Sequence, residues 1–460
     1  MTDKIPRYNT AERIVESPAR ALEKTVDAIG VANRYVTSNG PIKKAKEYWQ
    51  TLGPGLTTGA ADDDPSGIAT YSQTGAKYGF QLIWLAGFTY PLMAIIQEMC
   101  ARIGIVTGRG LASTIRHQFP KPVLLLCATL LFAANSFNIG ADLGAMAKAI
   151  QLFKPELSYN LLIVFFALIS LSLQIFIPYK IYSKYLKWLA LVLFAYVLSA
   201  LLVGLDWHAV LKAAVIPSLK ADKDQIILIC GILGTTISPY LFFWQTSQEV
   251  EEKIMGGQTS IKLRKSDVTN EEIKKMRIDI WSGMLLSNAA MFFIIAACAA
   301  TLFNFGNTNI GTAADAAEAL RPLAGDGAFL LFALGIIGVG LLAIPVLAGS
   351  ASYAIAESFG WKEGLFYKLN EAYAFYGVII ISMLFGLGIN FFGLDPIKTL
   401  IYSAVANGLV APVILVIIVL ISSNKKIMGS RVNHPVTTII GWLITAGMII
   451  AGLATIYSFF

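Results

Sequence analysis

Three adjacent carboxylates interrupt the first strongly apolar stretch of this chain. Asp62, Asp63 and Asp64 are followed directly by Pro65 and, two positions later, by Gly67. A carboxylate at the centre of a membrane-spanning helix costs roughly 2.5–3.5 kcal/mol, and proline removes a backbone hydrogen-bond donor. The pattern therefore predicts a broken helix in which carboxylates and freed backbone carbonyls, such as that of Ala61, bind a cation near the middle of a membrane.

A second apolar stretch is interrupted in a parallel way between Gly231 and Tyr240, with a proline at position 239. Thr235 and Ser238 place hydroxyl groups at this break, and the backbone carbonyl of Thr235 is a further candidate oxygen donor. The alternative is that these hydroxyls hydrogen-bond to carbonyls of their own helix, as membrane Ser and Thr often do. Two interrupted helices at matching positions point to the substrate site of a transporter.

The acidic candidates also have alternative roles. Asp64 precedes a proline, so it can cap the second half of its helix as well as bind an ion. Successive helical residues are about 100° apart, so Asp62 and Asp63 cannot both point the same way as Asp64. Either they extend the site or they line the approach to it.

Four further residues are candidates for supporting roles. Glu98 and Asp142 are possible relay or gating groups, although Arg102, one turn from Glu98, suggests an ion pair instead. Tyr240 can gate the site or simply pack. Asn407 lies near the middle of the tenth span and can hold a coordinated water.

The composition identifies an all-α integral membrane protein. The 460 residues are 56% hydrophobic and 14% charged, with a mean hydropathy of +0.63, whereas soluble domains carry about 25% charged residues. A span needs about 20 apolar residues. Eleven such stretches are predicted at about 52–76, 82–106, 122–147, 158–177, 182–203, 225–245, 279–302, 327–349, 372–392, 399–421 and 436–458.

The positive charges predict the orientation. Of the 36 Lys and Arg residues, 28 fall in the N-terminal tail and in alternate connections, which places the N-terminus in the cytoplasm and the C-terminus outside. The basic charge then belongs to the cytoplasmic rim of a plasma (inner) membrane protein, and nucleic acid is not expected as a partner. We expect a monomer in the lipid bilayer, with the first span acting as an uncleaved anchor.

The two breaks also predict the internal organisation. Spans 1 and 6 are both interrupted, and an odd number of spans per repeat inverts the second copy. We therefore expect a cytoplasmic tail at 1–51, a first repeat of five spans at 52–203, an inverted second repeat at 225–421, and an eleventh helix at 436–458. Residues 17–29 have the spacing of an interfacial helix, and the charged connection 249–277 is expected to be solvated.

Several segments resemble the Nramp family of divalent-metal transporters. Gly53-Pro54-Gly55 and Asp64-Pro65-Ser66-Gly67 are similar to its first helix, and the segment 97–108 closely resembles the end of its second. Asp142-Leu143 is similar to its third helix, and the segment 236–240 lies where the family has Met-Pro-His. The resemblance covers about residues 50–458. It implies a LeuT-like fold with a 5+5 inverted repeat, alternating access and divalent-cation transport.

The departures from the family pattern concern the site itself. The family's binding Asp is kept as Asp64, but its Asn is Gly67, its Met is Ser238 and the preceding Ala is Thr235. Losing the soft thioether removes a preference for transition metals, and Gly67 leaves an oxygen-only, roomier site. Mg²⁺ usually keeps several of its waters. The sequence is therefore similar to the Nramp-related magnesium transporters, and Mn²⁺ is expected to pass as well.

The family's two histidines in the sixth helix are replaced by Tyr240 and Gln245, and an acid of its third helix by Ala145. These losses favour uptake that is driven by the membrane potential rather than strictly coupled to protons. Two alternatives are a cation-coupled transporter of a small organic solute and a membrane sensor that does not transport. No cofactor is expected, and the absence of a nucleophile–base pair or a nucleotide-binding loop argues against an enzyme.

Overall fold

The computed structural model describes residues 41–458 apart from positions 178, 221, 267, 305, 307–312 and 393–395. The interfacial helix expected at 17–29 lies outside these residues. Helix α2 (Pro41–Thr51) belongs to a separate unit that ends at Leu52, and the remaining helices form a second unit from Gly53 onward. The described residues contain helices and no strands, as the sequence predicts.

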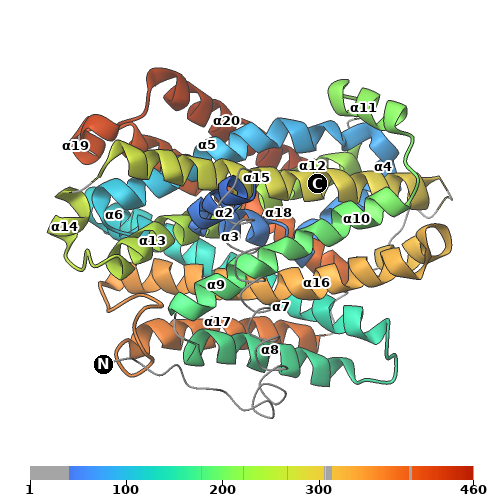
Figure 1. The fold of residues 1–460 in the computed structure, drawn as a ribbon, viewed down its shortest axis with the longest axis horizontal. Helices are drawn as coiled ribbons and strands as arrows, with labels where there is room; N and C mark the ends of the chain where they lie inside the picture. The colour runs from blue at the N-terminus through green and yellow to red at the C-terminus, as the bar shows by residue number, and fades with distance from the viewer. Residues whose placement is uncertain are drawn as a thin grey trace, which may run out of the picture. The chain divides into compact units, whose positions relative to one another are not determined.

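The main helices follow the predicted order of spans (Figure 1). They are α3 (Pro54–Asp62), α4 (Pro65–Tyr78), α5 (Trp84–Thr107), α7 (Lys121–Gln151), α8 (Tyr159–Phe176), α9 (Tyr179–Leu189), α10 (Phe194–Leu202), α12 (Lys223–Thr236), α13 (Pro239–Met255), α15 (Asn270–Cys298), α16 (Ala313–Phe359), α17 (Tyr373–Ile389), α18 (Pro396–Ser422) and α20 (Pro435–Ser458). Shorter helices in the connections are α6 (Leu111–Gln118), α11 (Trp207–Val215), α14 (Ile261–Ser266) and α19 (Lys425–Met428).

Both predicted breaks are present. Helix α3 ends at Asp62 and α4 begins at Pro65, while α12 ends at Thr236 and α13 begins at Pro239. Proline at the first helical position lacks only an N–H that has no partner inside the helix, so each new half-helix starts there without penalty. Asp64 caps α4, because its side chain accepts a hydrogen bond from the backbone N–H of Gly67.

Nine helices in the described residues are long and apolar enough to span a membrane, or up to ten if a bent pair is counted as one span. The two halves of the first broken helix are short, so the exact number of eleven spans stays a prediction. Some boundaries differ from those expected: α15 begins at Asn270 instead of 279, and α16 is interrupted only at Gly325, which has a positive φ.

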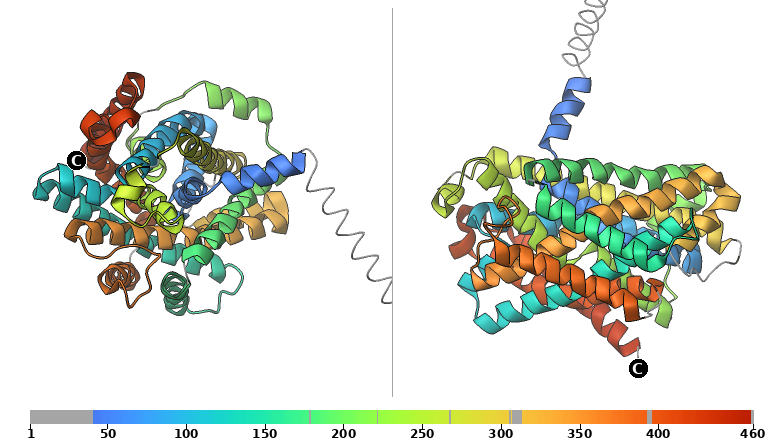
Figure 2. Two further views of the ribbon diagram at one scale, coloured as in Figure 1. Left: turned by 60° about the vertical axis from the view of Figure 1, so that its left-hand side comes forward. Right: turned by 90° about the horizontal axis from the view of Figure 1, so that it is seen from below.

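The first broken helix lies inside the bundle (Figures 1 and 2). Its halves α3 and α4 both contact α15 and α16, and α12 of the second broken helix contacts α4 and α18. Helices α8 and α17 lie against each other along the lower edge in Figure 1.

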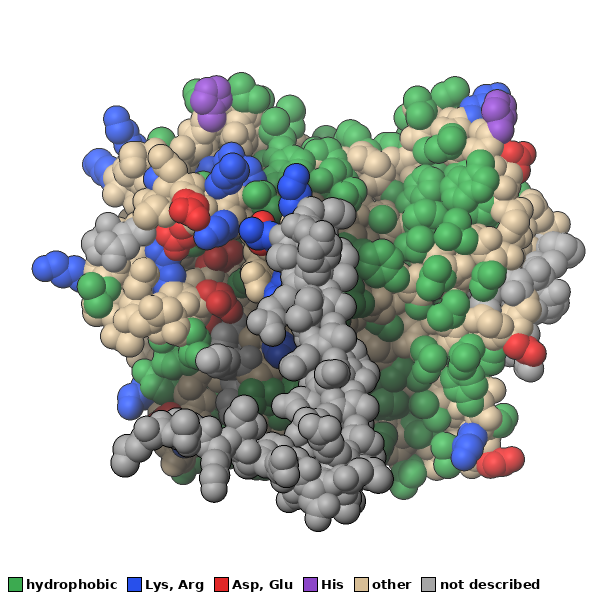
Figure 3. Space-filling model, in the orientation of Figure 1, with side chains coloured by type: hydrophobic (Ala, Val, Ile, Leu, Met, Phe, Trp, Pro, Cys, Tyr) green, Lys and Arg blue, Asp and Glu red, His purple; other side chains and the backbone are tan. Residues whose placement is uncertain are grey.

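In Figure 3, hydrophobic side chains cover much of the right-hand part of the view. Charged side chains gather at the left end, near α6, α14 and α19.

Close backbone contact and a buried carboxylate fix α3 against α15. The carboxylate of Asp279 accepts hydrogen bonds from the backbone N–H groups of Gly53 at 2.7 Å, Gly55 at 2.7 Å and Leu56 at 3.0 Å. These are N–H groups that no helical carbonyl can reach. A Cβ atom at Gly283 would collide with the backbone carbonyl of Gly55. The start of the first broken helix is therefore held at the predicted cytoplasmic end.

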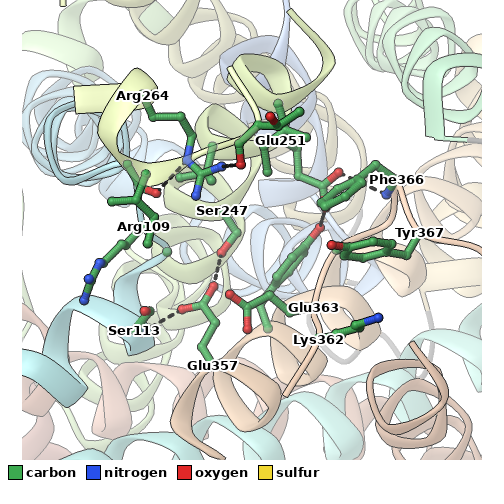
Figure 4. Close-up of a pocket in the computed structure, with 18 of the residues that line it drawn as sticks. Arg109, Ser113, Ser247, Glu251, Arg264, Glu357, Lys362, Glu363, Phe366 and Tyr367 are labelled. Carbon is green, nitrogen blue, oxygen red and sulfur yellow. Dashed lines mark hydrogen bonds between the residues drawn. The ribbon is translucent and has the colours of Figure 1, made fainter. Parts of the chain in front are cut away.

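A cavity of about 480 Å³ is lined by residues of α6, α13 and α16 and of the connections beside them (Figure 4). Glu357 accepts hydrogen bonds from Ser113 N and Ser247 Oγ. The carboxylate of Glu363 faces the same space (Figure 4). Burial raises the pKa of Glu363 to about 7, although Arg116 and Arg264 lower it.

The expectation that the whole connection 249–277 is solvated is wrong. Helix α13 continues to Met255, and Glu251 is only 2% exposed. Its carboxylate accepts hydrogen bonds from the Tyr353 hydroxyl and from the backbone N–H groups of Leu365 and Phe366. Glu251 therefore connects α13 to α16 and to the chain that follows α16. A run of charges in the sequence does not reveal this role.

The contact between α3 and α15 makes a testable prediction. Gly283→Val should lower the free energy of unfolding by about 1–3 kcal/mol or more, because the added atoms meet backbone that cannot move aside. The measurement is thermal unfolding in detergent, followed by tryptophan fluorescence. Gly87→Val is the matched control, because a Cβ at Gly87 meets nothing within 4 Å. Equal effects of the two substitutions would contradict the close-contact account.

Candidate functional site

Asp64 lies at the centre of the candidate site and is 1% exposed. Its Oδ1 accepts hydrogen bonds from Ser66 Oγ at 2.6 Å and from Gly67 N at 2.8 Å. Its Oδ2 accepts one from Asn138 Nδ2, on α7, at 2.7 Å. Capping of α4 by Asp64, one of the two roles considered for this residue, is therefore present. Capping uses Oδ1, and Asn138 occupies one side of Oδ2. The open side of Oδ2 is therefore where this carboxylate can contact an ion.

Asp62 and Asp63 are both 0% exposed. Asp62 and Asp64 face different helices, whereas Asp63 lies near Ser287, the residue that Asp62 binds. Asp62 Oδ2 accepts a hydrogen bond from Ser287 Oγ, on α15, at 2.7 Å, whereas Asp64 faces Asn138 on α7. Among the described residues, no three acidic, histidine or cysteine side chains converge where they could hold one metal ion. The arrangement is therefore not a closed cage of carboxylates.

The second break lies directly against the first. Tyr240, on α13, donates a hydrogen bond from its hydroxyl to the carbonyl of Ala61 at 2.7 Å, and this hydroxyl is 3.4 Å from Asp64 Oδ2. Ser238 Oγ lies 2.7 Å from the carbonyl oxygen of Gly234 and 2.6 Å from that of Thr235. The Ser238 proton is therefore used by the last turn of α12, across the break, while the oxygen lone pairs stay available.

Gly67 and Thr235 occupy adjoining space. A Cβ atom at Gly67 would lie 2.8 Å from Thr235 Oγ1, which in turn is 3.3 Å from the backbone oxygen of Asp62. The roomier site expected from Gly67 is thus partly filled by the hydroxyl of Thr235. Gly67 and Thr235 both differ from the family pattern, and neither adds sulfur, so the polar atoms of the lining remain oxygens.

The buried charge at the breaks has no basic partner in the part of the chain that the structure describes. The ion pairs found there do not include Asp62, Asp63 or Asp64. Among the described residues, Oδ1 of Asp62 and both carboxylate oxygens of Asp63 and Asp142 form no hydrogen bond, although Asp63 lies near Ser287 and Asp142 near the backbone of Ser66. Removing an unpaired carboxylate from water costs several kcal/mol even after relaxation. A cation accompanied by water would supply both the missing charge and the missing hydrogen bonds.

The structure separates the remaining candidates. Asn407 is 1% exposed, and neither end of its amide has a partner among the described residues, so it stays a candidate for holding water. Asp142 is also fully buried. Glu98 instead forms a structural cluster: it binds Arg277 through two hydrogen bonds of 3.0 and 2.8 Å, accepts one from Trp281, and lies 3.7 Å from Arg102. The ion pair with Arg102 is thus present.

Two residues that contact the carboxylates, and a third that binds one of those two, were not predicted from the sequence. Ser287 binds Asp62, Asn138 binds Asp64, and Ser403, on α18, donates to Asn138 Oδ1. Each is a polar residue inside an otherwise apolar helix. Polar side chains in spans are expected to face the bundle interior, and this rule could have identified them as candidates, although not their partners.

The family model described as "Natural resistance-associated macrophage protein-like" (Nramp) matches residues 55–458. Among curated relatives, the divalent metal cation transporter MntH of Bacillus subtilis is 25% identical over 411 residues, which is 88% of this chain and 91% of that protein. The MntH of Yersinia pestis is 27% identical over 425 residues, or 91% of this chain and 96% of that protein.

Two solved structures have the same fold. The Eremococcus coleocola manganese transporter aligns with a TM-score of 0.72 at 20% identity, covering 91% of this chain and 88% of its own. Mhp1, a nucleobase-cation-symport-1 family transporter, aligns with a TM-score of 0.57 at 16% identity, covering 88% and 91%. The LeuT-like fold expected from the sequence is confirmed. With a family model that matches nearly the whole length of the helical bundle, the chain belongs to the Nramp family.

Proposed function

We propose that this chain is a secondary transporter of divalent metal cations that favours Mg²⁺, also accepts Mn²⁺, and binds a largely hydrated ion between its two broken helices. The observation that carries the proposal is the set of three carboxylates, each at most 1% exposed, without a basic partner among the described residues. The MntH relatives are named as divalent metal cation transporters, which supports the same substrate class.

The preference for Mg²⁺ follows from the chemistry of the lining. Thr235, Ser238 and Tyr240 offer oxygen atoms, and no Met or Cys stands at the positions where the breaks meet. Hard oxygen ligands suit Mg²⁺ and Mn²⁺, whereas thioethers select softer metals. Asp62 and Asp64 face different helices, which favours an ion that keeps its waters, since water molecules can bridge groups that direct ligation cannot reach.

The driving force in this proposal is the membrane potential. A divalent ion that enters a compartment 100 mV negative inside gains about 4.6 kcal/mol, from about 2.3 kcal/mol for each charge. This energy concentrates the ion by about three orders of magnitude, since about 1.4 kcal/mol is worth a factor of ten. Proton coupling is therefore not required for uptake. Alternating access would expose the buried carboxylates to one side of the membrane at a time.

The direct test is uptake by proteoliposomes under an imposed potential, negative inside, with Mg²⁺ and internal pH followed by separate fluorescent probes. The wild-type protein should take up Mg²⁺ and Mn²⁺ saturably and without internal acidification. Asp64→Asn should lower uptake at least about tenfold, the loss expected when a charged partner of a buried ion is removed. Glu271→Gln is the matched control, because Glu271 pairs only at the surface with Lys275.

Internal acidification that accompanies influx would contradict the uncoupled mechanism and leave the substrate class in place. If the wild-type protein takes up no divalent ion under any gradient, the proposed function is wrong, and a small organic solute or a sensing role becomes the better explanation.

Ion preference gives a second prediction. Ser238→Met should raise the ratio of Cd²⁺ to Mg²⁺ uptake by about tenfold, because a thioether at the break adds a ligand that soft metals prefer. Competition of Cd²⁺ with Mg²⁺ in the same vesicles measures this ratio. Ser238→Ala removes the hydroxyl without adding sulfur and should leave the ratio close to that of the wild type. An equal response of the two variants would show that the side chain at position 238 does not contact the ion.

A further inference from the structure

The hydrogen bonds of Asp64 determine how this carboxylate can approach an ion. An ionised carboxylate has about four acceptor positions. Both positions of Oδ1 are taken, by Ser66 Oγ and Gly67 N. On Oδ2, Asn138 Nδ2 occupies one position at 2.7 Å. The Tyr240 hydroxyl is 3.4 Å from Oδ2 but only 2.7 Å from the Ala61 carbonyl, to which it gives its single proton.

The orientation of the Asn138 amide is fixed by Asp64, because an ionised carboxylate only accepts hydrogen bonds. The NH₂ end of the amide therefore faces Asp64, and the oxygen end faces α18, where Ser403 donates its hydroxyl proton to Asn138 Oδ1. The opposite orientation would place two acceptors, Oδ1 and the carboxylate, against each other. An NH₂ group cannot be a ligand of a metal ion. Asn138 therefore touches Asp64 and does not itself offer an oxygen to the ion.

We propose that Asn138, held by Ser403, is a positioning residue that sets ion preference by occupying one of the two acceptor positions of Asp64 Oδ2, so that a single open position remains and contact with the cation through a bridging water is favoured. This inference rests on the proposed function. An ion that loses its waters reluctantly, such as Mg²⁺, is favoured by contact through water. If Asn138 is removed, both positions of Oδ2 are open and direct ligation becomes easier, so Mn²⁺, which accepts carboxylate ligands readily, gains relative to Mg²⁺.

The same helix provides a matched control. Asn135 is fully buried and lies one turn before Asn138, but its amide donates to the carbonyl of Leu347 and to Ser350 Oγ. Ser382 is likewise a buried serine that binds α7, through Ser136 at 3.0 Å. Substituting these residues removes a buried amide or hydroxyl of the same kind without changing the surroundings of Asp64.

The experiment compares Mg²⁺ and Mn²⁺ uptake in proteoliposomes. Asn138→Ala and Ser403→Ala should shift the ratio of Vmax/KM for Mn²⁺ over Mg²⁺ toward Mn²⁺ by about fivefold or more, the range expected for the loss of one hydrogen bond to a carboxylate. Ser403→Thr keeps the hydroxyl and should restore the wild-type ratio. Asn135→Ala and Ser382→Ala should leave the ratio unchanged, even if they lower overall activity.

A binding measurement separates this inference from the proposed function. Pulsed EPR in D₂O counts the waters on Mn²⁺ bound to purified protein, and Asn138→Ala should show fewer waters than the wild type. Unchanged water counts and ion ratios in both variants, with an active wild type, would overturn the role of Asn138 alone. A wild type that neither binds nor transports Mn²⁺ or Mg²⁺ would overturn the proposed function and this inference with it. Ser403→Ala retains the Asn138 amide, so it tests the role even where Asn138→Ala does not fold.

Discussion

The structure of this protein depends on the burial of three neighbouring carboxylates where the first membrane helix breaks. Charges at this depth are costly without partners, and the breaks are arranged so that Asp62 and Asp64 meet different parts of the bundle. Asp62 faces α15 through Ser287, whereas Asp64 faces α7 through Asn138. Tyr240 closes the second break against the first by binding the Ala61 carbonyl. The helices that surround the breaks are thereby linked to the charges they enclose.

The two breaks interrupt the helices and also gather the polar groups of the candidate site. Prolines at positions 65 and 239 allow the half-helices to begin inside the membrane, and the interrupted backbone brings carbonyls and hydroxyls to the same place as the acids. Asp62 and Asp64 face different helices, and no three acidic, histidine or cysteine groups converge in the described chain. This is why we propose an ion that carries its own waters. The contact of α3 with α15, through Asp279 and Gly283, holds the start of the first broken helix in place.

The sequence predicted what depends on local chemistry. The fold class, both breaks, the capping role of Asp64 and the different directions of Asp62 and Asp64 follow from proline, from carboxylates in an apolar stretch, and from helical geometry. What it could not predict depends on tertiary contacts. Nothing in the local pattern pairs Asn138 with Ser403, which are 265 residues apart, or shows that Thr235 fills the space beside Gly67. Glu251 was expected in solvent because charge runs usually are, yet its partners come from a distant segment of the chain.

The central claim is that a divalent cation lies beside Asp64 between the two broken helices, and anomalous X-ray diffraction from crystals soaked in Mn²⁺ tests it most directly. Mn²⁺ scatters anomalously and Mg²⁺ does not, so competition by Mg²⁺ can be read from the same signal. We predict one anomalous peak at a distance from Asp64 that leaves room for one bridging water, and we predict that excess Mg²⁺ removes it. A peak only in the cavity beside Glu357 and Glu363, or no peak at all in crystals soaked in Mn²⁺, would contradict the account.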